Sequence, residues 1–240
     1  MSVILSVARR ELSSLFRLPV GWIAIALYLF LAGIVFAYMI LNPGQPATMR
    51  PLFSISAWLL VPVAPAISMR LLSEEFRTGT IESLMTAPVT DASIVIGKYL
   101  GAVGFLILML IPTALHTGAL WWLSDPSPDP GPVAAGYASL LLVGMLYTAV
   151  GLWMSALTSN QTLAFLGTLF FLLVLLLATT IGYEYAPAWM QPAISYISIQ
   201  SRMQDFAKGI IDVSHVIFFV SGSVLFIALS ITTVESRRWR

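Results

Sequence analysis

The chain has 240 residues, of which 58% are hydrophobic and 10% are charged, whereas a soluble domain carries about 25% charged residues. The net charge of +1 excludes a nucleic-acid partner, because a phosphate-binding surface of that kind needs a basic cluster that the sequence does not assemble. The absence of cysteine excludes disulfides, thiol catalysis and thiolate metal sites. The charges lie in islands between apolar stretches long enough to cross a bilayer, which predicts a single membrane domain over residues 1–240.

Residues 1–19 are predicted to form an amphipathic helix that lies flat on the cytoplasmic leaflet. Over residues 3–18 the apolar side chains share one helical face, and the charged ones turn mostly away. The apolar residues are Leu5, Ala8, Leu12, Leu15 and Phe16, and the charged ones are Arg9, Arg10 and Glu11. We do not expect a cleavable signal, because the first long apolar run comes only after these charges and no small-residue cleavage site follows it.

Long uncharged runs predict an all-α integral membrane protein with six transmembrane helices. They cover residues 20–41, 51–69, 99–123, 133–157, 162–183 and 214–234, and the polar turn Thr158–Gln161 separates the fourth from the fifth. Pro62, Pro65 and Pro112 are expected to kink the second and third spans. The external segment Ser124–Pro132 cannot continue a helix, and the external segment 184–212 is long enough for short helices that dip back toward the membrane.

The basic residues predict the orientation, because Lys and Arg concentrate in cytoplasmic loops. With the N-terminus inside, nine fall on the cytoplasmic side, namely Arg9, Arg10, Arg17, Arg70, Arg77, Lys98, Arg237, Arg238 and Arg240, and three fall outside, namely Arg50, Arg202 and Lys208. The outer ends carry Trp121, Trp122, Tyr183, Tyr185 and Trp189, whose amphipathic rings favour the headgroup level. We therefore expect both termini in the cytoplasm.

The most charged internal segment spans residues 70–98, RLLSEEFRTGTIESLMTAPVTDASIVIGK, and is predicted to be cytoplasmic. Thr80 is expected to cap a short helix that Pro88 limits to about two turns. Gly79 tolerates dihedral angles that other residues avoid, which would allow the turn that starts this helix. Thr90 or Asp91 then caps the third span.

A short capped helix between two membrane helices would act as a rigid lever. Its exposed charged residues, Glu74, Glu75, Arg77 and Glu82, would offer contacts to a soluble partner. The alternative is a solvated loop whose charges extend to water in the ordinary way.

The sequence carries no nucleotide-binding or hydrolytic motif. The Gly97-Lys98 pair is followed by Tyr99 and lacks the upstream glycine of a phosphate-binding loop. The two histidines belong to no H-E-x-x-H pattern, and G-x-S-x-G is absent. An enzyme of its own is therefore not expected, and neither catalytic nor metal-ligating residues are assigned.

His116 lies in the third span between Thr113 and Thr117, toward its outer side. These three residues are a possible substrate path, since ionisable groups inside membranes are often functional. The alternative is a neutral imidazole bonded to a neighbouring helix.

His215 is expected at the outer interface. In the fourth span Gly144 with Thr148 and Gly151 with Ser155 form small-xxx-small pairs, which favour close helix packing within the chain, with a dimer contact as the alternative.

The string SEEFRTGTIESLMTAPVTDASIVIGKYLGA resembles the segment after the second span of ABC-2 type permeases, and most closely that of the gliding-motility-associated permease subunit. The strings RRELSSLFRLPVGW, LTSNQTLAF, FAKGIIDVSHVIFF and ESRRW are also similar to that subunit, as are the pairs Met69-Arg70 and Pro112-Thr113. The resemblance extends in order over nearly the whole chain.

This resemblance implies a membrane-spanning subunit of an ATP-driven exporter in a bacterial inner membrane. It implies an N-terminal surface helix, short external helices before the sixth span, and a cytoplasmic coupling helix that docks on a separate ATPase. The coupling residues would be Glu74, Glu75, Arg77, Gly79, Thr80 and Glu82. ATP and Mg would be bound by that partner, with no cofactor held by this chain. A second permease copy or a related membrane subunit would complete the unit, with an external auxiliary domain as an optional part.

Two other functions are considered. A secondary carrier or channel would place acidic or basic residues inside its spans, and the predicted spans have none. A structural membrane anchor of a larger envelope complex remains an alternative.

Overall fold

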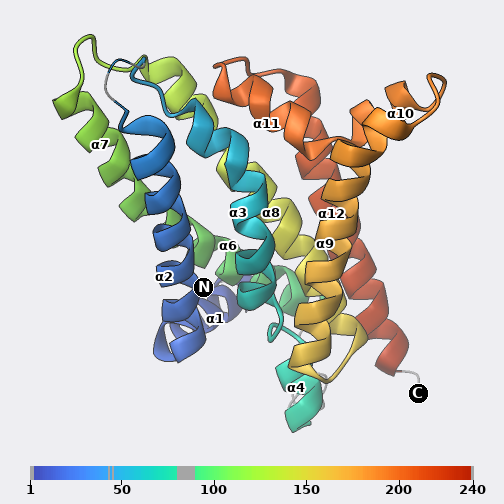
Figure 1. The fold of residues 1–240 in the computed structure, drawn as a ribbon. Coiled ribbons are helices and arrows are strands. Elements are labelled where there is room, and N and C mark those ends of the chain that lie inside the picture. The colour runs from blue at the N-terminus through green and yellow to red at the C-terminus, as the bar shows by residue number, and fades with distance from the viewer. Residues whose placement is uncertain (1–2, 43, 45, 80–89, 239–240) are drawn as a thin grey trace.

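The computed structural model describes residues 3–238, apart from residues 43, 45 and 80–89, and within these ranges it is entirely helical, as predicted. The α-helices are α1 (Val3–Arg17), α2 (Pro19–Val35), α3 (Arg50–Ser68), α4 (Ser73–Thr78), α6 (Asp91–Leu110), α7 (Ala114–Leu123), α8 (Pro130–Leu157), α9 (Gln161–Tyr185), α10 (Gln191–Ile197), α11 (Ile199–Ala207) and α12 (Val213–Arg238). Figure 1 shows their arrangement.

Six helical stretches of the described chain are long and apolar enough to cross a membrane. They are Pro19–Ile40, Arg50–Thr78, Asp91–Leu123, Pro130–Leu157, Gln161–Tyr185 and Val213–Arg237. The six predicted spans are thus confirmed. The third begins at Asp91 rather than near Tyr99, because Lys98, which the uncharged run excluded, is a buried residue inside α6.

Proline breaks only one of the two spans in which kinks were predicted. Pro112 lies in a 3-10 turn, Ile111–Thr113, that separates α6 from α7, as expected for a residue without a backbone N–H. α3 continues as one helix through Pro62 and Pro65, and its end is closed by a bond from the Met69 N–H to the Pro65 carbonyl at 2.8 Å.

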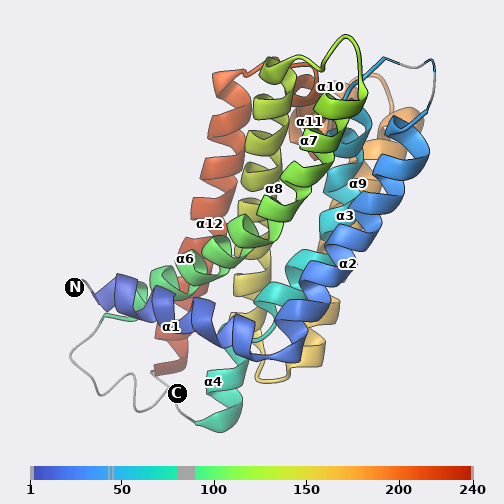
Figure 2. The same ribbon diagram turned by 90° about the vertical axis from the view of Figure 1, so that its left-hand side faces the viewer.

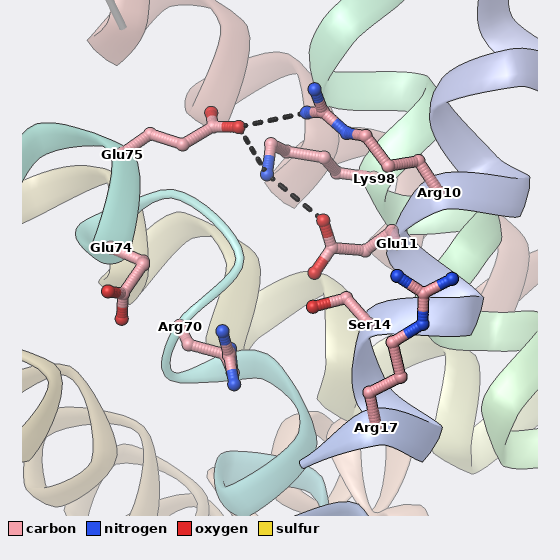
Figure 3. A pocket seen from close by; sticks show the side chains of 8 residues that line it. All are labelled: Arg10, Glu11, Ser14, Arg17, Arg70, Glu74, Glu75 and Lys98. Atoms are coloured by element: carbon pink, nitrogen blue, oxygen red, sulfur yellow. Dashed lines mark hydrogen bonds and ion pairs between the residues drawn. The ribbon is translucent and has the colours of Figure 1, made fainter. Parts of the chain in front are cut away.

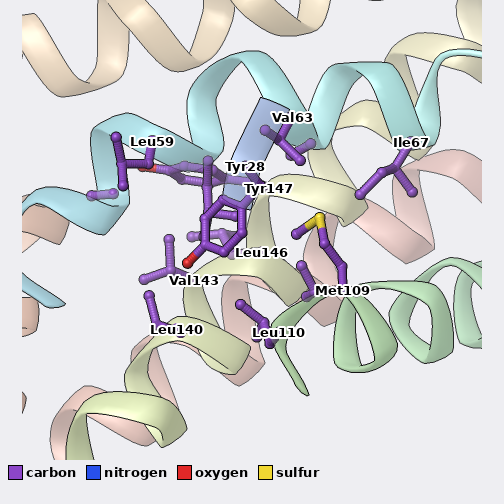
Figure 4. Packing of buried hydrophobic residues seen from close by; sticks show 14 of the residues in the cluster. Tyr28, Leu59, Val63, Ile67, Met109, Leu110, Leu140, Val143, Leu146 and Tyr147 are labelled. Carbon is purple, nitrogen blue, oxygen red and sulfur yellow. The ribbon is translucent and has the colours of Figure 1, made fainter. Parts of the chain in front are cut away.

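α8 lies at the centre of the molecule and packs against α3, α6, α9, α11 and α12. Figure 4 shows its Tyr147 among aliphatic side chains from α3 and α6, with Tyr28 of α2 close by. Close approach depends on glycine: a Cβ at Gly151 would lie 1.8 Å from Ser68 Oγ, and one at Gly144 would lie 2.3 Å from a methyl group of Leu106. The interpretation of these glycines as packing positions within the chain is therefore confirmed.

The outer helices of the bundle, α2, α9 and α12, leave broad apolar faces uncovered. In the spans that they form, 28%, 28% and 17% of an 18-residue apolar stretch is buried inside the molecule, whereas 67% is buried in each of the other three spans. These faces are suited to lipid or to another membrane chain.

The two ends of the bundle differ. Both termini, α1 and α4 lie at one end, and α10, α11 and the α7–α8 connection lie at the other (Figures 1 and 2). α1 runs across the ends of the spans (Figure 2), and its place on a membrane surface stays a prediction. The short helices expected in 184–212 are α10 and α11, and α11 packs against α3 and α8 through Ile199, Met203 and Phe206.

Candidate functional site

A hollow of about 390 Å³ opens at the end of the molecule that carries the termini. Its walls come from α1, the α3–α4 connection, α4 and α6 (Figure 3). The lining residues are Arg10, Glu11, Ser14, Arg17, Arg70, Glu74, Glu75 and Lys98. This charged junction contains two of the residues that the sequence analysis assigned to coupling, Glu74 and Glu75.

Lys98 is the centre of the junction and is only 2% exposed. Its Nζ donates to Glu11 Oε2 at 3.1 Å and to Glu75 Oε1 at 2.9 Å. Arg10 also donates to Glu75 Oε1, at 3.1 Å. Two cations therefore face two carboxylates, which is the balance that buried charges require.

Two glycines of α6 bring α1 close enough for these contacts. A Cβ at Gly97 would lie 2.7 Å from Val7 Cβ, and one at Gly101 would lie 2.7 Å from Glu11 Cβ. Because α1 docks here, Glu11 faces α6, and the prediction that it turns away from the packed face was wrong. Leu5, assigned to that face, is 55% exposed in the protein alone.

Glu75 also departs from the prediction, which made it an exposed contact for a partner. It is buried, and one of its oxygens joins α4 to α1 and α6. Its other oxygen, Oε2, is buried without a hydrogen-bond partner among the described residues. Glu74 is more accessible and accepts bonds from Arg77 at 2.7 Å and from the side-chain amide of Gln161. The turn between α8 and α9 therefore also contacts α4.

Further contacts hold α4 to the membrane helices. Ser155 of α8 accepts bonds from the backbone N–H groups of Leu72 and Ser73 at 3.0 and 2.9 Å, and its hydroxyl donates to the Met69 carbonyl at 3.0 Å. On the other side, the Arg237 guanidinium of α12 lies 4.3 Å from the centre of the Phe76 ring. α4 is thus joined to α1, α6, α8, α9 and α12.

Gly79 ends α4 in the left-handed conformation, with φ of 70°. We had expected it to start the following helix, but its observed place is the C-cap of the preceding one, where glycine adopts this conformation without steric cost. The proposed cap Thr80 and the coupling residue Glu82 lie outside the described residues. Of the two candidates for the cap of the third span, Thr90 accepts a bond from the Ser93 N–H.

The possible substrate path divides into two parts. The hydroxyl oxygens of Thr113 and Thr117 lie 3.3 and 3.1 Å from the Tyr137 hydroxyl. The His116 ring instead packs on Phe36, with ring centres 4.8 Å apart. His116 Nδ1 is buried and has no hydrogen-bond partner in the described part of the chain, so the expected bond to a neighbouring helix is not seen at this nitrogen.

A second buried charge lies at the opposite end and was missed. Arg202 of α11 is 5% exposed, and it donates to His215 Nδ1 at 2.7 Å and to the Tyr196 carbonyl at 2.6 Å. Its guanidinium lies 4.2 Å from the centre of the Phe218 ring. Burial lowers the pKa of Arg202, and nearby Asp205 and Asp212 oppose that effect. No local spacing in the sequence indicated this joint between α10, α11 and α12, because the chain reverses between Arg202 and His215.

Comparison with known proteins shows the family of the chain. Residues 5–235 match the family model described as ABC-2 family transporter protein. The chain belongs to the ABC-2 family. It is therefore a multi-pass membrane protein of a permease family, and in ABC transporters ATP is bound by a partner ATPase.

Two curated relatives are similar to part of this chain. Each is described as a probable multidrug ABC transporter permease YbhR, one from Escherichia coli strain K12 and one from Escherichia coli O157:H7. Both are 29% identical to this chain over 142 residues, which is 58% of the chain and 37% of the relative. The match thus spans well under half of the relatives' length.

Proposed function

We propose that the chain is the permease half of an ATP-driven exporter in a bacterial inner membrane, and that its cytoplasmic ATPase docks on α4 and the residues that follow it. The observation that carries this proposal is the fixation of α4: one short helix at the end of the bundle contacts α1, α6, α8, α9 and α12. A force applied to α4 would therefore reach several spans. Both termini lie at the same end as α4 and would be cytoplasmic.

The roles of the coupling residues follow from their exposure. Arg77, Thr78 and Gly79 are exposed and would meet the ATPase, with Thr80 and Glu82 completing that surface. Glu74 would hold α4 to the α8–α9 turn. Glu75, because it is buried, would transmit motion to α1 and α6 rather than touch the partner.

The substrate would be an amphipathic compound, in line with the multidrug description of the relatives. An apolar pocket of about 250 Å³ at the break between α6 and α7 supports this choice. Tyr137 lines the pocket together with Ile107, Leu110, Ile111, Ala114 and Leu141, and its hydroxyl contacts Thr113 and Thr117. A mostly apolar wall with one polar group suits such a molecule. His116 would lie beside this path.

The working unit would contain a second permease copy or a related membrane subunit. The uncovered faces of α2, α9 and α12 support this proposal, because they could pack against another chain. An external auxiliary domain and membership of the gliding-motility subgroup are finer proposals, which rest on the sequence resemblance alone.

Site-specific photocrosslinking tests the docking surface. A photoreactive side chain at Thr78 should crosslink to the ATPase in reconstituted vesicles, whereas the same group at Arg9, on the exposed face of α1, should not. Equal crosslinking from both positions would refute α4 as the docking helix. The ATPase activity of the co-purified partner distinguishes an exporter from a membrane anchor. If ATP hydrolysis does not depend on this subunit, the anchor is the better assignment.

A further inference from the structure

The charged hollow has more positive charge than its carboxylates neutralise. Its lining contains four basic residues and three acidic ones. Each of the three carboxylates already has a partner: Glu11 and Glu75 bind Lys98, and Glu74 binds Arg77 and Gln161. Arg17 and Arg70 have neither an ion pair nor a side-chain hydrogen bond within the described residues. Two guanidinium groups therefore remain available.

A second hollow of about 350 Å³ adjoins the first along α1 and has no acidic lining residue. Its lining residues are Ser6, Arg9, Arg10, Ser13 and Arg17. Arg10 and Arg17 line both hollows, so the two form one basic surface. The sequence did not reveal a cluster here, because Arg70 joins the arginines of α1 only in the folded chain.

This basic surface lies where the membrane begins. Arg17 is the last residue of α1, directly before the first span, which starts at Pro19. Arg70 follows α3, which ends at Ser68. Trp22 is 58% exposed and its indole N–H donates to the Phe16 carbonyl at 2.9 Å. An exposed indole of this kind favours the headgroup level, so the arginines lie at that depth.

We propose that this surface binds the phosphate of an anionic membrane phospholipid in the leaflet next to α1. Guanidinium groups donate paired hydrogen bonds to phosphate oxygens, and serine hydroxyls can add another. In Figure 3 the Ser14 hydroxyl lies between the guanidinium groups of Arg17 and Arg70, and the free oxygen of Glu75 points away from them. The headgroup would contact Arg17, Arg70 and Ser14, while the acyl chains would lie against the bundle.

A lipid fits the position better than a soluble protein does. α4 extends beyond α1 from the bundle in both views of the fold, so a partner approaching from the aqueous side meets α4 first (Figures 1 and 2). The surface on α1 lies nearer to the spans, at the depth of headgroups. The lipid site is independent of the proposed coupling role of α4, since neither Arg17 nor Arg70 bonds to α4 through its side chain.

Native mass spectrometry of protein released from nanodiscs tests the site. The nanodiscs contain equal amounts of phosphatidylglycerol and phosphatidylcholine with the same acyl chains. Wild type should retain phosphatidylglycerol in preference to phosphatidylcholine. In the double variant Arg17→Gln/Arg70→Gln the ratio of retained phosphatidylglycerol to phosphatidylcholine should fall at least fivefold. Arg50→Gln, at the opposite end of the molecule, is the matched control and should keep it.

Further arms distinguish the alternatives. Arg17→Lys/Arg70→Lys keeps the charge and should recover part of the preference, which guards against a double variant that has simply lost its fold. Inorganic phosphate should not displace the lipid, and displacement would show a site for free phosphate instead. If the Gln variant retains phosphatidylglycerol as wild type does, the proposal is overturned. It is also overturned if, in chemical labelling of arginine, the ATPase protects Arg17 and Arg70 and phosphatidylglycerol does not.

Discussion

Lys98 Nζ lies 2.9 Å from Glu75 Oε1, so a buried ion pair joins the third span to α4, the short helix at the end of the second. The same ammonium group binds Glu11 of α1. One side chain thus connects three elements that are separate in the sequence, and it is one of the points at which displacement of α4 would reach the membrane helices.

Replacing Lys98 should be costly. Lys98→Met would leave the carboxylates of Glu11 and Glu75 buried without their shared cation, and we expect a loss of about 3 to 5 kcal/mol in the free energy of unfolding. Removing the charges of both carboxylates in the same chain should restore much of the loss. Arg77→Met, which breaks an exposed pair with Glu74, is the control and should cost about 0 to 1 kcal/mol. Denaturant unfolding in micelles measures both, and equal losses would show that water reaches the junction.

Gly151 and Gly118 should respond to alanine with opposite signs. A Cβ at Gly151 would collide with Ser68, so Gly151→Ala must separate α8 from α3 at a cost of about 1 to 3 kcal/mol. A Cβ at Gly118 meets no described residue within 4 Å, and Gly118→Ala should gain up to about 1 kcal/mol from helix propensity. Thermal unfolding of the two variants checks the difference, and a neutral Gly151→Ala would contradict the packing.

Gly79→Leu should abolish transport and uncouple ATPase stimulation while leaving membrane insertion intact. A clash with the described residues, which exclude 80–89, is not the reason, because none of them lies within 4 Å of a Cβ there. The reason is the backbone: at φ of 70° a leucine costs about 1 to 2 kcal/mol and would unwind the end of α4. Gly79→Asn is the matched control, since asparagine tolerates this conformation. Vesicle transport with the ATPase present is the measurement, and normal activity of the leucine variant would move the coupling surface elsewhere.

Asp212 should contribute stability in a pH-dependent manner. Hydrogen bonds from the backbone and side chain of Ser214 lower the pKa of Asp212 below its ordinary value of 3.8. A carboxylate with a lowered folded-state pKa stabilises the fold above its unfolded-state pKa, and this contribution disappears as the pH falls through the folded-state value. Asp212→Asn should therefore lower the unfolding temperature at neutral pH and leave it unchanged in strong acid. A deficit that persists in acid would show that the charge is not responsible.

Accessibility labelling tests the orientation, and the chain has no native cysteine to interfere. In intact cells an impermeant maleimide should label Ser127→Cys, in the exposed connection between α7 and α8, and should not label Ser236→Cys near the end of α12. The reverse pattern would invert the proposed topology.

The helices and the six spans could be predicted because they depend on local properties: uncharged length and helical periodicity. Lys98 shows where this approach fails. A lysine normally ends an apolar run, and the sequence could not show that Glu11 and Glu75 neutralise it inside the helix.

The charge of the proposed coupling segment could be seen in the sequence, but the contacts of its side chains could not, and its coupling role stays a prediction. Glu74, Glu75 and Arg77 were recognised from their charge, yet charge alone does not distinguish an exposed glutamate from a buried one. The burial of Glu75 follows from the docking of α1 on Gly97 and Gly101. The sequence alone does not show that α1 packs on these two glycines. The Arg202 joint was missed for the same reason.

The bond between Lys98 and Glu11 also sets an order of assembly. The two residues are 87 positions apart, so Glu11 leaves the ribosome well before its partner has been synthesised. Until α6 has entered the membrane, the carboxylate must stay in water, because burying it unpaired is too costly. We therefore expect α1 to take its final place only after the third span is inserted, which would make its docking a late step in biogenesis although α1 is synthesised before α6.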